Sequence, residues 1–269
     1  MIALLLGFIR WNPDPTIFRL GPLAPRWYGL LFALGFLIGF YIMRRIFQRE
    51  GKPVPDLDFL LMYLVGGTIL GARLGHILFY APGYYLQNPG EIIQIWEGGL
   101  ASHGGLIGVI LAIWLYSRSR EGQPFLWLLD RLSVPVALTG CFIRLGNLFN
   151  SEILGTPTEV PWAFIFEARS PVPRHPAQLY ESISYFLIFL VLGALYRRYG
   201  KDTPRGLLFG LFMTLIFGVR FLIEFVKASQ AHFEVYLPLS MGQLLSIPAV
   251  LIGLYFLWAA RRSTTEAPA

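Results

Sequence analysis

The sequence predicts an all-α, polytopic membrane protein with seven transmembrane helices. Two observations indicate this fold class. Only 14% of the 269 residues are charged and 55% are hydrophobic, whereas about a quarter of the residues of a soluble domain are charged. The hydrophobic residues also gather in runs close to the length of about 20 residues that a helix needs to cross a bilayer. We therefore expect one membrane domain over residues 1–262, followed by a disordered tail over residues 263–269.

Seven apolar runs are candidate spans. They cover residues 27–47, 57–80, 100–116, 125–149, 179–196, 206–226 and 241–260. Lysine and arginine concentrate in the short cytoplasmic connections of membrane proteins. One set of alternate connections carries twelve of these residues, and the opposite set, which includes the N-terminal segment, carries five. This asymmetry predicts an N-terminus outside and a C-terminus in the cytoplasm, in agreement with an odd number of spans.

The outer connections differ in composition. Residues 81–99 are rich in tyrosine, tryptophan, proline and glycine, which suits an interfacial or re-entrant loop. Residues 150–178 are long and contain five prolines, so we expect them to form a small outer cap. The N-terminal apolar run has no basic region and no small-residue cleavage site, so it resembles an interfacial segment more than a signal peptide.

The composition also argues against several functions. The net charge is +6, but no stripe of lysine or arginine marks a nucleic-acid surface. A single cysteine, Cys141, excludes a disulfide framework and a paired-thiol metal site, and we expect it to be a small packing residue. The four histidines lack the spacing of metal ligands, so neither a metal nor another cofactor is expected.

The stretch 140–155, GCFIRLGNLFNSEILG, is the strongest candidate site. Arg144 and Asn147 are three residues apart, so they share one face of the fourth predicted span. A guanidinium within the bilayer costs roughly 2.5–3.5 kcal/mol on insertion scales, and such groups usually mark function. Because guanidinium donors match phosphate oxygens, we interpret this face as a phosphate site, with Glu152 orienting an arginine or fixing the loop. A structural ion pair between spans is the alternative.

Charged groups on other spans lie at a similar depth, about 5–12 Å below the outer edge for a rise of about 1.5 Å per residue. Arg220 and Glu224 are four residues apart on the sixth predicted span, and we expect them to pair. Together with Arg144, Arg220 would bring two guanidiniums to one cavity, which suits a phosphodiester. Tyr28 opens the first span and either binds a headgroup or belongs to the aromatic belt.

His103 lies between Ser102 and two glycines at the outer start of the third span. Burial and neighbouring arginines disfavour the imidazolium, and a neutral imidazole is a competent general base toward a thiol. A hydrogen-bonded interfacial histidine is the alternative. Adjacent positions do not suit a nucleophile–base pair, so we reject a serine hydrolase. The role of Arg73 and His76 stays open between ligand contact and bracing of the bundle.

The remaining polar candidates have structural interpretations. His175, Gln178 and Glu181 precede or begin the fifth span, and we expect them to shape the cap. Asp130 and Arg131 lie near the cytoplasmic end of the fourth span, where snorkelling toward water accounts for their charge.

Six motifs occur in order over nearly the whole chain: RWYGL (26–30), SHGGLIG (102–108), RLGNLFNSEILG (144–155), RHPAQLYE (174–181), RFLIEF (220–225) and LSMGQLLSIP (239–248). This set resembles the bacterial prolipoprotein diacylglyceryl transferase family. The resemblance implies a seven-span inner-membrane enzyme with a periplasmic N-terminus and cap, and a site toward the outer leaflet. It also implies that the diacylglyceryl group of phosphatidylglycerol moves to the lipobox cysteine thiol of a prolipoprotein signal peptide, which releases glycerol phosphate in the first step of lipoprotein maturation.

Matching the motifs residue by residue assigns the functional positions. His103, Arg144 and Arg220 are the expected catalytic residues. The expected phosphatidylglycerol-binding residues are Tyr28, Arg144, Asn147, Glu152, Gly155, Arg220 and Glu224. The chain departs from the usual family pattern at Ile143, Leu148, Ile216 and the stretch VKASQ after Phe225, which concerns the fine headgroup contacts.

Two other functions compete with this interpretation. A transporter or lipid flippase would line a path with charges at several depths, including the inner half of the membrane. The intramembrane charges here cluster on the outer side, which favours a one-sided site. The second competitor is a phospholipid-headgroup transferase with a different acceptor.

Overall fold

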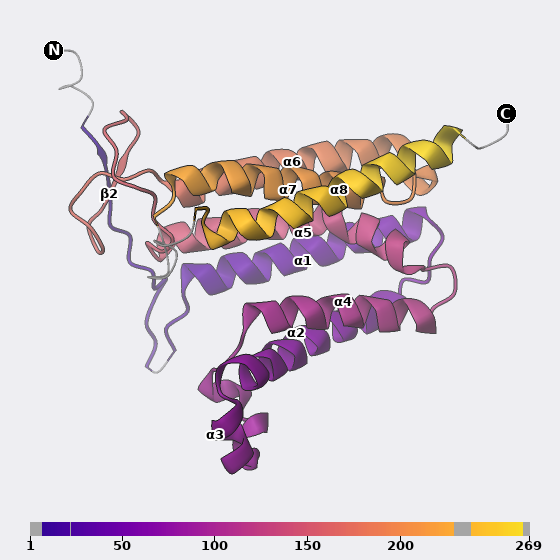
Figure 1. Ribbon diagram of the computed structural model, residues 1–269, viewed down its shortest axis with the longest axis horizontal. Coiled ribbons are helices and arrows are strands. Elements are labelled where there is room, and N and C mark those ends of the chain that lie inside the picture. Colours follow the sequence, from indigo (N-terminus) through magenta and orange to yellow (C-terminus); the bar gives the residue numbers. More distant parts are fainter. Residues whose placement is uncertain (1–6, 22, 229–237, 266–269) are drawn as a thin grey trace. The chain divides into compact units, whose positions relative to one another are not determined.

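The computed structural model describes residues 7–21, 23–228 and 238–265, and these are mostly helical (Figure 1). The α-helices are α1 (Trp27–Arg49), α2 (Asp56–Tyr80), α3 (Pro82–Gln87), α4 (Ser102–Ser119), α5 (Phe125–Phe149), α6 (Ala177–Tyr199), α7 (Leu207–Ile223) and α8 (Met241–Thr265). Short 3-10 helices are η1 (Pro89–Ile93), η2 (Ile95–Glu97), η3 (Gly200–Asp202) and η4 (Glu224–Val226). Strands β1 (Ile9–Trp11) and β2 (Phe164–Phe166) pair in parallel.

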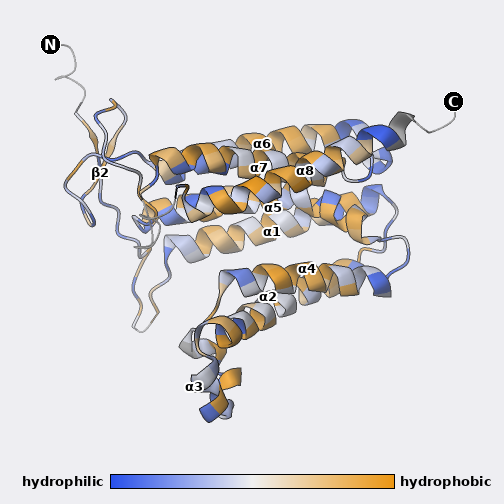
Figure 2. Cartoon of the chain, viewed as in Figure 1, coloured by the Kyte–Doolittle hydropathy of each residue, from blue (hydrophilic) through white to orange (hydrophobic). Residues whose placement is uncertain are grey.

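Six helical segments among the described residues are long and apolar enough to cross a membrane. They are Trp27–Arg49, Asp56–Tyr80, Phe125–Phe149, Ala177–Asp202, Leu207–Val226 and Met241–Arg262. Hydrophobic residues run along the lengths of these helices, and hydrophilic residues gather at many of their ends (Figure 2). The third predicted span corresponds to α4, which has 18 residues and opens with a serine and a histidine. A helical multi-pass protein is therefore confirmed, whereas the seventh span and the orientation stay predictions.

Two compact units make up the chain. One consists of Met1–Met43 with Leu129–Ala269, and the other of Arg44–Leu128. The division falls within α1 and α5, so α2, α3 and α4 lie wholly in the second unit. The single domain predicted over residues 1–262 stays a prediction. Helix α8 continues to Thr265, and residues 266–269 of the predicted tail lie outside the described residues.

Local chemistry sets several helix boundaries. Gly200 has a φ of 56° directly after α6, a left-handed conformation in which glycine commonly ends helices. Ser240 and Gln243 bracket the start of α8 as a capping box. The backbone N–H of Gln243 donates to Ser240 Oγ at 3.2 Å, and the backbone N–H of Ser240 donates to Gln243 Oε1 at 3.1 Å.

In the second unit, glycines allow α2 and α4 to pack with their backbones in contact. A Cβ added at Gly67 would lie 2.6 Å from the carbonyl oxygen of Gly108 and 2.6 Å from the Cβ of Ala112. A Cβ added at Gly75 would lie 2.7 Å from the Cα of Gly104. Small residues at four-residue spacing are typical of close helix pairs in membranes. This contact sets the height of the first turn of α4 along α2.

We expect Gly67→Ala to lower the stability of the protein by about 1–3 kcal/mol, because the added methyl group overpacks the α2–α4 contact. Gly66→Ala is the matched control, since no atom lies within 4 Å of its added Cβ. This neighbouring substitution should be neutral or stabilise the helix by up to about 1 kcal/mol. Apparent melting temperatures in one detergent give the comparison, and equal values for the two variants would contradict the contact.

Arg73 organises the loop between α2 and α4. Its side chain is 5% exposed, and its guanidinium lies over the ring of Tyr85 at 4.9 Å. It donates hydrogen bonds to the backbone carbonyls of Glu91, Ile92, Gly98 and Gly99. These contacts commit the guanidinium donors to the loop. Bracing therefore accounts for Arg73, and the ring of His76 stacks on Tyr80 beside it.

In the first unit, Asp130 caps α7. Its carboxylate accepts hydrogen bonds from the backbone N–H groups of Gly206 at 2.7 Å and Phe209 at 2.9 Å, where a negative charge also suits the helix dipole. Asp130 is 0% exposed and Arg131 is 1% exposed. The expectation that this pair snorkels toward water is wrong, because both side chains are enclosed by protein.

The predicted cap packs onto the end of α5 through an aromatic cluster. Leu148, Phe164 and Phe166 are buried together, with Trp11 packed against them. The indole of Trp11 donates to the backbone carbonyl of Leu148 at 2.9 Å. The N-terminal strand and the 150–178 segment therefore hold the stretch that follows Asn147.

Candidate active site

The polar residues of α5 lie as their spacing predicts. Arg144 Nη1 donates a hydrogen bond to Asn147 Oδ1 at 3.3 Å. Asn147 Nδ2 in turn donates to Glu152 Oε2 at 3.3 Å. The three side chains therefore form one chain that ends on the carboxylate of the following turn. Asn147 is only 6% exposed, so its amide is fixed by these contacts.

The turn that presents Glu152 is strained. Ser151 and Ile153 have φ values of 52° and 57°, and the left-handed region is a genuine outlier for a β-branched residue. Such a conformation costs on the order of 1–3 kcal/mol and persists only where its surroundings enforce it. Gln178, which is 0% exposed, donates to the carbonyl of Glu152. This bond, with the hydrogen bond from the N–H of Glu152 to the carbonyl of Asn147 at 3.0 Å, holds the turn.

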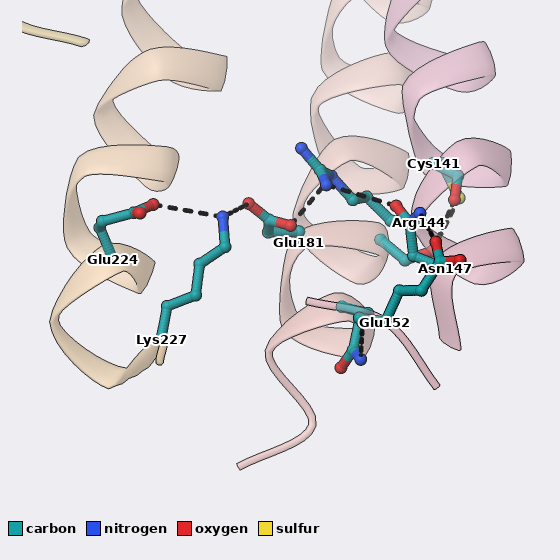
Figure 3. Close-up of polar contacts among 9 residues, drawn as sticks. Cys141, Arg144, Asn147, Glu152, Glu181, Glu224 and Lys227 are labelled. Carbon is teal, nitrogen blue, oxygen red and sulfur yellow. Dashed lines mark hydrogen bonds and ion pairs between the residues drawn. The ribbon is translucent and has the colours of Figure 1, made fainter. Parts of the chain in front are cut away.

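Beyond Arg144, the chain of charges continues onto α6 and η4. Arg144 Nε lies 2.9 Å from Glu181 Oε2. The other oxygen of Glu181 lies 3.5 Å from Lys227 Nζ, which also lies 3.2 Å from Glu224 Oε2. Figure 3 shows Lys227 between the two carboxylates. The expectation that Arg220 pairs with Glu224 is therefore wrong, because Lys227 takes that carboxylate.

No carboxylate pairs with Arg220 in the part of the chain that the structure describes. Its Nε is buried and has no hydrogen-bond partner among the described residues. Arg220 and Arg144 both lie within electrostatic range of Tyr185, which is 5% exposed. Both guanidiniums therefore act electrostatically on the same side chain of α6. An unpaired buried donor on a cation is costly, and a bound anion would supply the missing acceptor.

Tyr28 lies against the backbone of the candidate site. A Cβ added at Gly146 would lie 2.7 Å from Tyr28 Cδ2, so the ring packs on α5 directly beside Asn147. The ring of Tyr28 also stacks on Phe32, one turn further along α1, with ring centroids 6.4 Å apart. The structure thus brings this predicted site residue to the same turn of α5 as Arg144 and Asn147.

Gly155 joins three segments by close backbone contact. It forms an antiparallel bridge with Lys227, and its N–H donates to the carbonyl of His175 at 3.1 Å. An added Cβ would lie 2.6 Å from the Cβ of His175 and 2.8 Å from the carbonyl oxygen of Val226. Only glycine fits this junction, which fixes the turn containing Glu152 relative to Lys227.

His103 occupies the first turn of α4 in the second unit. Its side chain is exposed, and no hydrogen bond to it is found within the described residues. The burial expected for this imidazole is therefore wrong, and its role as a general base stays a prediction. Cys141, by contrast, is 6% exposed, and its Sγ lies 3.2 Å from Ser182 Oγ, in agreement with a packing residue.

Comparison with known proteins identifies the family. A family model described as prolipoprotein diacylglyceryl transferase matches residues 15–259. The chain belongs to this family. Three relatives bear the name phosphatidylglycerol–prolipoprotein diacylglyceryl transferase. The protein from Chloroherpeton thalassium is 53% identical over 94% of this chain and 94% of its own length. The protein from Tolumonas auensis is 55% identical over 91% and 94%, and that from Bacteroides fragilis is 46% identical over 94% and 96%.

Two residues of this transferase-family site were missed by sequence reasoning. Glu181 was expected to shape the cap, yet it is 0% exposed and pairs with Arg144. Lys227 was noted only as part of a departure from the family pattern. A signal was present for both, because an ionisable residue at the end of an apolar run is a functional candidate by default. The pairs that Glu181 makes with Arg144 and Lys227 join distant segments, so spacing does not predict them. Glu224 and Lys227 are three residues apart, and spacing did allow that pair.

Proposed function

We propose that the protein transfers the diacylglyceryl group of phosphatidylglycerol to the cysteine thiol of a prolipoprotein, with release of glycerol phosphate. The family and the names of the relatives support this transferase reaction. The structural observation that carries it is the guanidinium of Arg220, whose buried Nε has no acceptor among the described residues. A phosphate diester is the anion that such a site accepts.

The substrates suggest where the reaction takes place. In our proposal the protein spans the bacterial inner membrane seven times, with α4 as the third span. Its N-terminus and the 150–178 segment lie in the periplasm, and its C-terminus lies in the cytoplasm. The site then faces the outer leaflet, where phosphatidylglycerol and a lipobox peptide both have access. This orientation places the connections that are rich in lysine and arginine on the cytoplasmic side, as the charge asymmetry favours.

In the proposed site, Arg144 and Arg220 grip the phosphate from two sides. Asn147 is held by Arg144 and Glu152, and it keeps the guanidinium of Arg144 in place. Tyr28 borders the headgroup from α1. Glu152 and Glu224 act mainly by holding cations or amides of the site, and Gly155 allows the supporting segments to meet.

The reaction then proceeds by displacement at carbon. His103 takes the proton of the cysteine thiol. The resulting thiolate attacks the carbon of the diacylglyceryl group that bears the phosphate. The new carbon–sulfur bond forms as the carbon–oxygen bond breaks, and its electron pair goes to the departing phosphate oxygen. Arg144 and Arg220 stabilise the negative charge that grows there, which is where preorganised donors contribute most to rate.

The test is a reconstitution of purified protein with labelled phosphatidylglycerol and a lipobox peptide. Lipidated peptide together with glycerol phosphate is the expected outcome. Redistribution of the lipid without a lipidated product would instead identify a flippase. Consumption of the lipid without the peptide would identify a headgroup transferase with another acceptor. A lipobox peptide with serine in place of cysteine is the matched substrate control.

His103→Asn is expected to lower kcat about 10²-fold, which is the low end for loss of a general base. The KM for phosphatidylglycerol should change little, because the phosphate contacts lie on other residues. Initial rates across pH with the lipobox peptide provide the measurement. A near-normal rate in this variant would remove His103 as the base and leave the phosphate site intact.

A further inference from the structure

Lys227 lies between Glu181 and Glu224 in this series of charged contacts, where no role had been expected for it. Its side chain is 4% exposed. The ammonium lies 3.5 Å from Glu181 Oε1 and 3.2 Å from Glu224 Oε2. Figure 3 shows its side chain, which follows η4, extending to both carboxylates. Its backbone is fixed as well, through the bridge to Gly155 and the hydrogen bond from Ala228 to the carbonyl of Leu154.

Glu181 connects Lys227 to the substrate-binding arginine. The carboxylate is 0% exposed, and its two oxygens face different cations, Arg144 through Oε2 and Lys227 through Oε1. A buried carboxylate needs its charge offset on both sides. Lys227 therefore sets how strongly the carboxylate of Glu181 attracts the guanidinium of Arg144.

Glu224 is held from two directions. Lys227 contacts its Oε2, and a Cβ added at Gly242 would lie 2.5 Å from the carboxylate carbon. Gly242 is in the first turn of α8, where backbone N–H groups and the helix dipole favour an anion. Lys227 thus ties the start of α8 to α6 through two carboxylates.

We propose that Lys227 is a positioning residue for phosphatidylglycerol. Its ammonium holds Glu181 at the distance that keeps Arg144 directed to the lipid phosphate, and it offsets two carboxylates that would otherwise repel that phosphate. This inference rests on the proposed transferase function. Arg144 and Arg220 contact the phosphate, and Lys227 acts through Glu181.

Removal of the ammonium has a specific consequence. Glu181 would keep Arg144 as its cationic partner, and Glu224 would lose the cation that it contacts. Glu181 would then hold Arg144 more strongly, and the local net charge would become more negative by one. Both changes weaken binding of a lipid anion, and neither acts on the peptide thiol.

The test compares Lys227→Met, Lys227→Arg and the control Lys201→Met in the reconstituted transfer assay. Lys201 is exposed and belongs to η3, so its substitution removes a positive charge without touching the site. We expect Lys227→Met to raise the KM for phosphatidylglycerol about tenfold or more, as for loss of one charge-assisted contact. The KM for the lipobox peptide should stay within about twofold of wild type, and Lys227→Arg should restore phosphatidylglycerol affinity to within about threefold.

Three results would overturn the proposal. The first is an unchanged KM for phosphatidylglycerol in Lys227→Met. The second is an equal rise in both KM values with a lower melting temperature, which indicates a general structural defect. The third is a failure of Lys227→Arg to restore affinity while its melting temperature matches wild type. Each result leaves the wild-type transfer reaction standing.

A binding assay separates this inference from the proposed function. Binding of labelled phosphatidylglycerol in mixed micelles is measured for the same variants, without peptide. If wild-type protein transfers nothing to the peptide, the transferase proposal fails on its own. The Lys227 inference is then judged by lipid binding: weaker binding in Lys227→Met but not Lys227→Arg supports it, and equal binding overturns it.

Discussion

Arg144→Ala is expected to lower diacylglyceryl transfer by about 10³-fold or more, because removal of a single preorganised donor already costs about 10²–10³-fold and Arg144 offers several. The variant also removes the donor to Asn147 and the cation that faces Glu181 Oε2. We expect the protein to insert and purify, with a lower melting temperature, since Glu181 keeps Lys227 as its partner.

Arg144→Lys is the matched variant for this prediction. Lysine keeps the positive charge but lacks the planar fork that binds two phosphate oxygens at once. It should therefore preserve most of the stability while transfer stays at least about tenfold below wild type. Transfer to a lipobox peptide and melting temperature are measured on the same preparations. Normal transfer by Arg144→Ala would remove the phosphate site from the proposal.

The local part of the site could be predicted from the sequence because it lies on one helix. Arg144 and Asn147 are three residues apart on α5, and the helix geometry alone places them together. The same rule failed for Arg220 and Glu224. Spacing permits their contact, but a lysine from the following segment reaches Glu224 at 3.2 Å. The rule also allows Glu224 to pair with Lys227, three residues further on, and it does not rank these two partners. The backbone bridge between Gly155 and Lys227 fixes the position of the lysine.

The fold class was predictable for a similar reason, since hydrophobic runs determine helices locally. The environment of each polar residue was not predictable from the sequence. Asp130 and Arg131 lie near the end of a span, which suggested exposure, but Asp130 caps α7 and both are buried. Arg73 illustrates the same limit, because its acceptors are backbone carbonyls that carry no mark in the sequence. Contacts between elements decided these cases.

The series of polar contacts from Glu152 to Glu224 supports the proposal that the site binds an anion. From Glu152 through Asn147, Arg144, Glu181 and Lys227 to Glu224, opposite charges or hydrogen-bonding groups alternate. Each cation in this series of contacts has an acidic neighbour. Arg220 stands apart from it within the described residues, although it shares Tyr185 as a neighbour with Arg144. We therefore expect the lipid phosphate to supply the acceptor that the Nε of Arg220 lacks among the described residues.

Arg220→Met is expected to separate activity from stability. Transfer should fall by about 10²–10³-fold, because a donor to the leaving phosphate is lost. The melting temperature should stay equal or rise, because an apolar side chain of similar length removes the desolvation cost of the buried, unpartnered Nε. Arg144→Met should lower both the transfer activity and the melting temperature, because the guanidinium of Arg144 is paired in the free protein.

Arg205→Met is the control for this comparison, since Arg205 is exposed just before α7. It should leave transfer and melting temperature near wild-type values. Addition of phosphatidylglycerol should raise the melting temperature of wild-type protein, because a ligand bound to the folded state stabilises it, and this rise should be absent in Arg220→Met. A variant that melts well below wild type without lipid would show that Arg220 already has a stabilising partner, and the reason for placing the lipid phosphate beside it would be lost.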